Sequence, residues 1–170
     1  MQTLFEKQVL PLIDSAYRYA MALTRSVADA EDLVQEATLR AYGSFTSLRG
    51  DDAKPWLLTI VRNTHLTLQR RRRTAISLSE LDETTDSVFV DSQPGPEELA
   101  CDTELQHLLG SLVAQLKPEQ REVLLLREVE DLNYREIANV LGIAEGTVMS
   151  RLARARAALK TLRDARRMEI

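Results

Sequence analysis

Apolar residues recur at intervals of three and four along most of this sequence, the spacing that places them on one face of a helix. The first such run covers residues 2–25. Pro11 lies inside it, and because proline lacks a backbone N–H, the pattern predicts that the helix starts near Pro11 or is kinked there. A second helix is expected to begin at Asp29, whose carboxylate can accept hydrogen bonds from the first turn. A third is expected from Pro55 to Arg73.

The same spacing returns in the C-terminal part of the sequence. Pro118 predicts the start of one helix, because its missing N–H is harmless in a first turn. Asn133, with Glu136 three residues later, predicts a capping box in which each side chain accepts a hydrogen bond from the other's backbone. Gly142 predicts a tight turn with positive φ, after which a final helix is expected from Glu145.

Between these two patterned parts the helical spacing fails, and Ser, Thr, Asp and Glu dominate. We expect a flexible acidic linker over residues 74–96, joining two small helical domains, 1–73 and 97–170. With 44% hydrophobic residues but only six glycines and five prolines, the chain is rich in helix formers and poor in hairpin signals. The prediction is therefore an all-α fold.

The net charge of −4 conceals an uneven distribution. Residues 62–73 carry five basic and no acidic groups, and residues 146–170 carry seven basic and two acidic groups. Between these clusters, residues 74–116 carry nine acidic and no basic groups. Two separate basic clusters in a chain that is acidic overall indicate two contacts with a polyanion.

The amino-acid composition and the absence of certain motifs argue against several classes of protein. One cysteine, Cys101, and two histidines are too few for an ordinary structural zinc site. The sequence has no glycine-rich phosphate loop, no H-E-x-x-H pattern and no nucleophile elbow. It also lacks an apolar run of about 18 residues and a basic-then-apolar N-terminus. We expect a cytoplasmic protein that is not an enzyme, uses no metal or cofactor and does not insert into a membrane.

Residues 134–156, YREIANVLGIAEGTVMSRLARAR, predict a helix-turn-helix with a basic second helix. Thr147, Ser150, Arg151 and Arg154 supply hydrogen-bond donors on that second helix, which suits DNA. A plain helical bundle could show the same apolar stripe and glycine turn, but it would not need the arginines. A regulator that binds DNA through this motif alone remains an alternative at this point.

Both halves of the chain resemble a known family. DAEDLVQEATLRAY, followed by WLLTIVRN and RRRR, resembles the promoter −10 module of bacterial extracytoplasmic-function (ECF) sigma factors. LKPEQREVLLLREVEDLNYREIANVLGIAEGTVMSRLARARAAL resembles their −35 module. The resemblance implies a two-domain initiation factor that binds core RNA polymerase and directs it to promoter DNA. It also implies an anti-sigma factor as a further partner.

The resemblance also carries residue roles to this sequence. At the −35 element it implies DNA contacts by Glu145, Thr147, Ser150, Arg151 and Arg154. At the −10 element, where a base is flipped from the opened strand, it implies contacts by Arg49, Lys54, Arg62, Asn63, Gln69 and Arg70. For docking on core polymerase it implies Asp32, Leu33, Gln35, Glu36, Leu39 and Arg40.

Overall fold

The computed structural model describes residues 2–79 and 104–169. Every regular element in these two stretches is helical, which confirms the all-α prediction. The chain divides into two compact units, Met1–Pro94 and Gly95–Ile170, called here the N-terminal and C-terminal units. Cys101 and the part of the expected linker after Ser79 lie outside the described residues.

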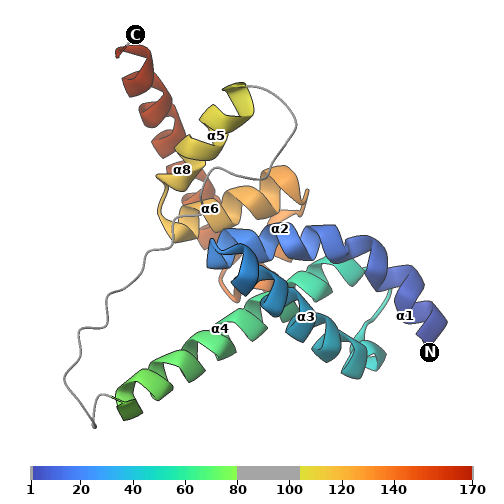
Figure 1. Ribbon diagram of the computed structural model, residues 1–170. Coiled ribbons are helices and arrows are strands. Elements are labelled where there is room, and N and C mark those ends of the chain that lie inside the picture. The colour runs from blue at the N-terminus through green and yellow to red at the C-terminus, as the bar shows by residue number, and fades with distance from the viewer. Residues whose placement is uncertain (1, 80–103, 170) are drawn as a thin grey trace. The chain divides into compact units, whose positions relative to one another are not determined.

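The N-terminal unit packs three helices against one another, and a short helix precedes them (Figure 1). These elements are α1 (Gln2–Val9), α2 (Ile13–Thr24), α3 (Val27–Gly43) and α4 (Ala53–Ser79). The single helix expected over residues 2–25 is thus interrupted. A 3₁₀ turn, Leu10–Leu12, replaces the α-helical pattern around Pro11, because Pro11 has no N–H to donate to the preceding turn.

The start of α3 differs from the prediction. The helix begins at Val27, and Ser26 is its N-cap: the Ser26 hydroxyl accepts a hydrogen bond from the Asp29 N–H at 3.4 Å. Asp29 therefore lies in the first turn, where its negative charge is favoured by the helix dipole. The expected cap at Asp29 was wrong because a second capping residue, Ser26, stands three residues upstream and was passed over.

Helix α4 is longer than predicted at both ends. It begins at Ala53 and continues to Ser79, six residues beyond the predicted end at Arg73. The segment after Arg73 was expected to leave the helix because it is rich in serine and threonine. It contains no glycine or proline, however, so nothing in it breaks the helical hydrogen bonds.

Small residues make up much of the core where α2 and α3 meet. The buried positions on these two helices include five alanines: Ala16, Ala20, Ala30, Ala37 and Ala41. Short side chains let two helix backbones approach closely. Larger side chains fill the remaining space, among them Tyr19, Leu57, Leu58 and Val61.

The C-terminal unit is built around its last and longest helix. Its elements are α5 (Glu104–Ala114), α6 (Pro118–Leu124), a π-helical turn (Leu125–Val129), α7 (Tyr134–Leu141) and α8 (Glu145–Arg167). Helices α5, α6 and α7 all pack on α8. The core contains residues from each of them, including Leu112, Val123, Leu126, Ile137 and Leu152.

The predicted local signals at α7 are confirmed. The Glu136 N–H donates to Asn133 Oδ1 at 2.9 Å, and the Asn133 N–H donates to Glu136 Oε2 at 2.8 Å, which completes the capping box. Gly142 ends the helix with a φ of 65°, in the left-handed region that glycine adopts without strain. Helices α7 and α8 therefore form the predicted helix-turn-helix, with α8 starting at Glu145.

Within the residues that the structure describes, no helix is both long enough and apolar enough to cross a membrane.

The capping box gives a first prediction. Replacing Asn133 with Ala should lower the free energy of unfolding by about 1 kcal/mol, because the Glu136 N–H loses its acceptor. Asn133→Ser is the matched control and should stay close to the wild type, since serine caps equally well. Urea unfolding followed by far-ultraviolet circular dichroism measures both. Equal stability of the alanine and serine variants would contradict the role assigned to the cap.

Candidate functional site

One face of α8 is buried and a neighbouring face carries basic and hydroxyl side chains. Val148, Leu152 and Ala155 are buried in the C-terminal unit. Because a helix turns once every 3.6 residues, the positions beside this stripe point outward together. They are the predicted −35 residues Thr147, Ser150, Arg151 and Arg154, of which Arg154 and Ser150 are exposed and the other two half-buried.

The structure brings these four residues together at one hollow, here called the α6–α8 hollow. The start of α6 supplies its other wall, with Lys117, Glu119 and Gln120. Sequence analysis missed these three residues. A lone lysine before a proline carries no signal of its own, and only the packing of α6 on α8 places it beside the arginines.

Glu145, the fifth predicted −35 residue, lies outside this hollow in the exposed first turn of α8. The residue before it, Ala144, is the N-cap and provides no side-chain hydrogen bond. The first N–H groups of α8 therefore have no capping side chain, unlike those of α7. Such a helix start favours an anionic group from outside the chain.

Arg156 also lies on α8 but contacts the protein instead of facing outward with Arg151. Its Nη2 lies 2.6 Å from Glu128 Oε1 in the π-helical turn. The hydrogen bond from Arg156 to Glu128 raises the pKa of the guanidinium above its ordinary value, and Tyr134 acts in the same direction. Arg127 lies over the Tyr134 ring, with its guanidinium carbon 5.2 Å from the ring centroid. These contacts connect the π-helical turn to both helices of the helix-turn-helix, to α8 through Arg156 and to α7 through Tyr134.

In the N-terminal unit, the predicted −10 residues of α4 share one side of the helix. Its buried positions are Leu57, Leu58, Val61 and Thr64. At roughly 100° per residue, Arg62, Asn63, Gln69 and Arg70 fall within an arc of about 120° on the other side. Asn63, Gln69 and Arg70 are exposed, and Arg62 is half-buried.

The remaining two predicted −10 residues, Arg49 and Lys54, lie where the chain enters α4. Arg49 is exposed in the turn before the helix, next to Gly50 with its φ of 67°. Lys54 is half-buried in the first turn of α4. Trp56, in the same turn, is half-buried: its ring centroid lies 6.4 Å from that of Phe45, and its Nε1 donates to Ser47 Oγ at 3.4 Å.

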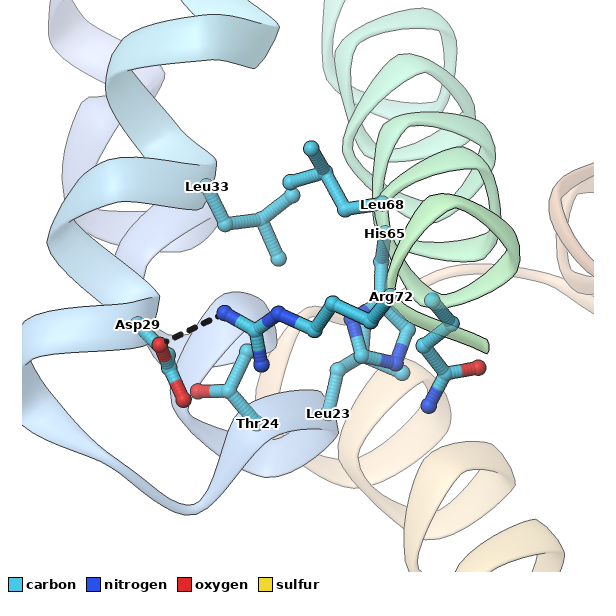
Figure 2. Close-up of a pocket in the computed structure, with 8 residues that line it drawn as sticks. Leu23, Thr24, Asp29, Leu33, His65, Leu68 and Arg72 are labelled. Carbon is cyan, nitrogen blue, oxygen red and sulfur yellow. Dashed lines mark hydrogen bonds and ion pairs between the residues drawn. The ribbon is translucent and has the colours of Figure 1, made fainter. Parts of the chain in front are cut away.

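A second hollow, here called the α3–α4 hollow, lies between the start of α3 and the second half of α4 (Figure 2). Arg72 reaches across it, and its Nη2 lies 2.8 Å from Asp29 Oδ1. The hydrogen bond from Arg72 to Asp29 raises the pKa of the guanidinium, and the charge of Asp32 acts in the same direction. Leu33, Leu68 and His65 line the hollow beside this pair.

Five of the six predicted polymerase-docking residues of α3 lie at the surface. Asp32, Gln35 and Leu39 are exposed, and Glu36 and Arg40 are half-buried and form an ion pair at 2.9 Å. Leu39 is apolar yet 64% exposed. The sixth residue, Leu33, is only 1% exposed; it belongs to the core of the unit and cannot contact a partner directly. Tyr42, near the end of the same helix, is exposed, and its ring makes an edge contact with that of Phe5, with 5.2 Å between the ring centroids.

Comparison with known proteins assigns both units to one class. The profile of Sigma-70 region 2 matches residues 8–75, and the profile of Sigma-70, region 4 matches residues 106–159. These two matches define a protein of the sigma-70 class, with region 2 in the N-terminal unit and region 4 in the C-terminal unit.

Individual relatives show which family of the sigma-70 class the chain belongs to. The ECF RNA polymerase sigma factor SigM of Bacillus subtilis is 31% identical over 150 residues, which cover 88% of this chain and 89% of SigM. The sigma factor RpoE of Bartonella quintana, solved in complex with the anti-sigma factor NepR, shares 28% identity with a TM-score of 0.72 over 94% of this chain and 96% of that one. CnrH, solved with the cytosolic domain of CnrY, shares 25% identity with a TM-score of 0.65 over 97% and 90% of the two chains. The chain belongs to the family of ECF RNA polymerase sigma factors.

These comparisons confirm the resemblance inferred from sequence and disfavour the alternative of a regulator with a helix-turn-helix alone. Such a regulator would leave the N-terminal unit without a role, whereas region 2 accounts for it from residue 8 to residue 75.

The difference between Leu33 and Leu39 gives a second prediction. Leu33→Ala should lower the free energy of unfolding by about 2 to 5 kcal/mol, because it removes buried methyl groups from a packed core. Leu39→Ala is the control in the same helix and should change stability by less than about 0.5 kcal/mol. Thermal unfolding of the two variants measures the difference, and similar losses for both would contradict the burial of Leu33.

Proposed function

We propose that this chain binds core RNA polymerase in the cytoplasm and directs it to promoters by contacting the −35 element with α8 and the −10 element with α4, without catalysing a reaction of its own. The observation that carries the proposal is the presence of one outward basic helix face in each sigma region. A single basic face would suit an ordinary regulator. Two such faces in separate units suit recognition of two promoter elements.

At the −35 element, the proposed contacts come from the outward face of α8. Arg151 and Arg154 can donate to base edges in the major groove or to adjacent phosphates. Thr147 and Ser150 lie one turn earlier, beside the helix start that has no capping side chain, where a DNA phosphate can accept from backbone N–H groups. Glu145 would accept from a base amine.

At the −10 element, the proposed contacts come from α4 and the turn before it. Flipping a base out of the duplex costs a few kcal/mol, so the flipped base and the exposed strand must be held by the protein. Asn63 and Gln69 provide neutral hydrogen-bonding groups, while Arg62 and Arg70 provide charge for the backbone. Arg49 and Lys54 add positive charge at the entrance to α4.

For polymerase, the proposed docking surface is the outer face of α3, formed by Asp32, Gln35, Glu36, Leu39 and Arg40. An exposed leucine among charged residues resembles the centre of many protein interfaces, where an apolar side chain is surrounded by a polar rim. Two of the solved relatives were determined in complexes, one of them with an anti-sigma factor. On that ground we propose an anti-sigma factor as a second protein partner of this chain.

A run-off transcription assay tests the function. Core polymerase that lacks any sigma factor should produce promoter-specific transcripts only after this protein is added, on at least some promoter fragments of the source genome. The control is a sample in which the protein has been heat-denatured. If no fragment supports specific initiation, yet the protein alone binds duplex DNA tightly, the function of a conventional regulator would replace the one proposed here.

The role of Arg151 can be measured separately. Arg151→Ala should weaken promoter binding by the polymerase holoenzyme by about 1 to 3 kcal/mol and relax discrimination at one position of the −35 element, if Arg151 contacts a base. Arg163→Ala is the control, because Arg163 lies further along the same helix and pairs with Asp164 at 3.2 Å. Binding is measured with promoter fragments substituted base by base. An equal loss on every sequence would assign Arg151 to a phosphate instead.

A further inference from the structure

The second half of α4 has little support from the rest of its unit. The last residue of this helix that is buried is Thr64. Every residue from Gln69 to Ser79 is exposed. Two of the proposed −10 residues, Gln69 and Arg70, lie in this exposed part. The helix backbone carries their direction outward from the buried half, and contacts at the flank of α4 can add to that support.

One contact does so directly, the ion pair between Arg72 and Asp29 across the α3–α4 hollow (Figure 2). It joins residues 43 positions apart in the chain. The two side chains are 65% and 36% exposed, so the pair is accessible to solvent but anchored on its α3 side. Leu68, one turn before Arg72, lies near Leu33 of α3 beside the pair.

Asp29 is itself held in place by the start of α3. Its backbone N–H donates to the Ser26 hydroxyl, and the Ala30 N–H donates to the Ser26 carbonyl at 2.8 Å. The first turn of α3 is thus closed around Ser26. A carboxylate on this closed turn presents a fixed acceptor to α4, unlike a carboxylate on a loop.

Arg72 points in a different direction from its neighbours in the arginine run. At roughly 100° per residue, Arg72 and Arg70 lie about 160° apart around the helix, and Arg73 lies between them on the outer side. Because Arg72 faces α3, Arg70 is turned away from it, while Gln69, about 60° from Arg72 around the helix, lies at the edge of the same hollow. The direction of the outward residues and the engagement of Arg72 are therefore linked.

We propose that Asp29 is a positioning residue for promoter opening, and that its ion pair with Arg72 holds the exposed end of α4 so that Gln69 and Arg70 meet the opened strand. This inference rests on the proposed function. It assigns Arg72 to a contact within the protein rather than to DNA, and it gives Asp29, which belongs to none of the contact sets above, a role in the −10 step.

The proposal predicts whether one substitution, Asp29→Asn, lowers or raises promoter opening. Removing an acidic charge near DNA strengthens binding when the charge only repels phosphate. If Asp29 positions α4, Asp29→Asn should instead reduce promoter opening, by about 1.5- to 5-fold, the range that an exposed ion pair supports. The measurement uses holoenzyme with the full chain and a fluorescent adenine analogue in the −10 element of a promoter that the wild type transcribes. Unchanged or increased opening would overturn the proposal.

Glu31→Gln is the matched control, because Glu31 is an exposed acid near the start of the same helix. It should leave promoter opening at the wild-type level. A loss equal to that of Asp29→Asn would show that the change in net charge causes the effect, and it would overturn the proposal. Arg72→Gln should lose as much opening as Asp29→Asn. Because both substitutions remove the same contact, the double variant should lose no more opening than the more impaired of the two single variants. The exchange Asp29→Arg with Arg72→Asp should recover part of the loss. Additive losses would overturn the proposal.

Salt dependence separates positioning from direct DNA contact. A residue that neutralises a phosphate lowers the slope of log K against log salt by about one when it is removed. Arg70→Gln should show this decrease, whereas Arg72→Gln should keep the wild-type slope. A lower slope for Arg72→Gln would place Arg72 on the phosphate backbone and overturn the proposal. Opening by the wild type tests the proposed function by itself, and only the differences among variants test the positioning role.

Discussion

The close packing of α2 against α3 is the constraint on which the N-terminal unit depends. Five buried alanines along the two helices allow their backbones to approach, and larger buried side chains such as Tyr19 and Leu57 complete the core. An alanine buries less apolar surface than a leucine, so contacts outside this core contribute to the position of the remaining elements. Helix α4 shows the consequence, because its first half shares this core and its second half extends past it.

The outward residues of α8 and α4 are held in place by different contacts. In α8, the apolar stripe of Val148, Leu152 and Ala155 runs beneath the basic residues, so the residues that face outward are supported from below. In α4, the core ends at Thr64 before the arginine run begins. Support there comes from the side, through Asp29. The position of α8 is fixed by its own buried face, whereas the second half of α4, which extends past the core, is supported by a side-chain contact from a neighbouring helix.

Much of this architecture could be predicted because its signals are local. Asn133 with Glu136 and the positive φ of Gly142 depend on residues within one turn, and the helical period identified α8 and its outward arginines. The errors were also local where two signals competed. Ser26 and Asp29 can both cap a helix, and only the geometry shows that Ser26 does. Thr74 and its neighbours resemble a linker in composition, yet the absence of a helix breaker lets α4 continue through them.

Contacts between segments that are distant in the chain could not be predicted from the sequence. Nothing in the order of residues pairs Arg72 with Asp29, brings Lys117 beside Arg151, or joins Arg156 to Glu128. The inclusion of Leu33 among the docking residues came from the resemblance, whereas its burial removes it from the surface. Residue type alone does not separate a leucine that packs from one, such as Leu39, that is exposed.

These long-range pairs change the meaning of the basic clusters. Counted along the chain, every arginine in the two clusters is a potential contact with DNA. In the folded units, Asp29 engages Arg72 and Glu128 engages Arg156, each at hydrogen-bond distance. An engaged guanidinium must break an existing ion pair before it meets a phosphate, whereas Arg70 and Arg154 need not break either of these pairs. These two acids therefore limit which arginines are left to face outward, and a chain with a net charge of −4 can present two confined positive faces, as the proposed function requires.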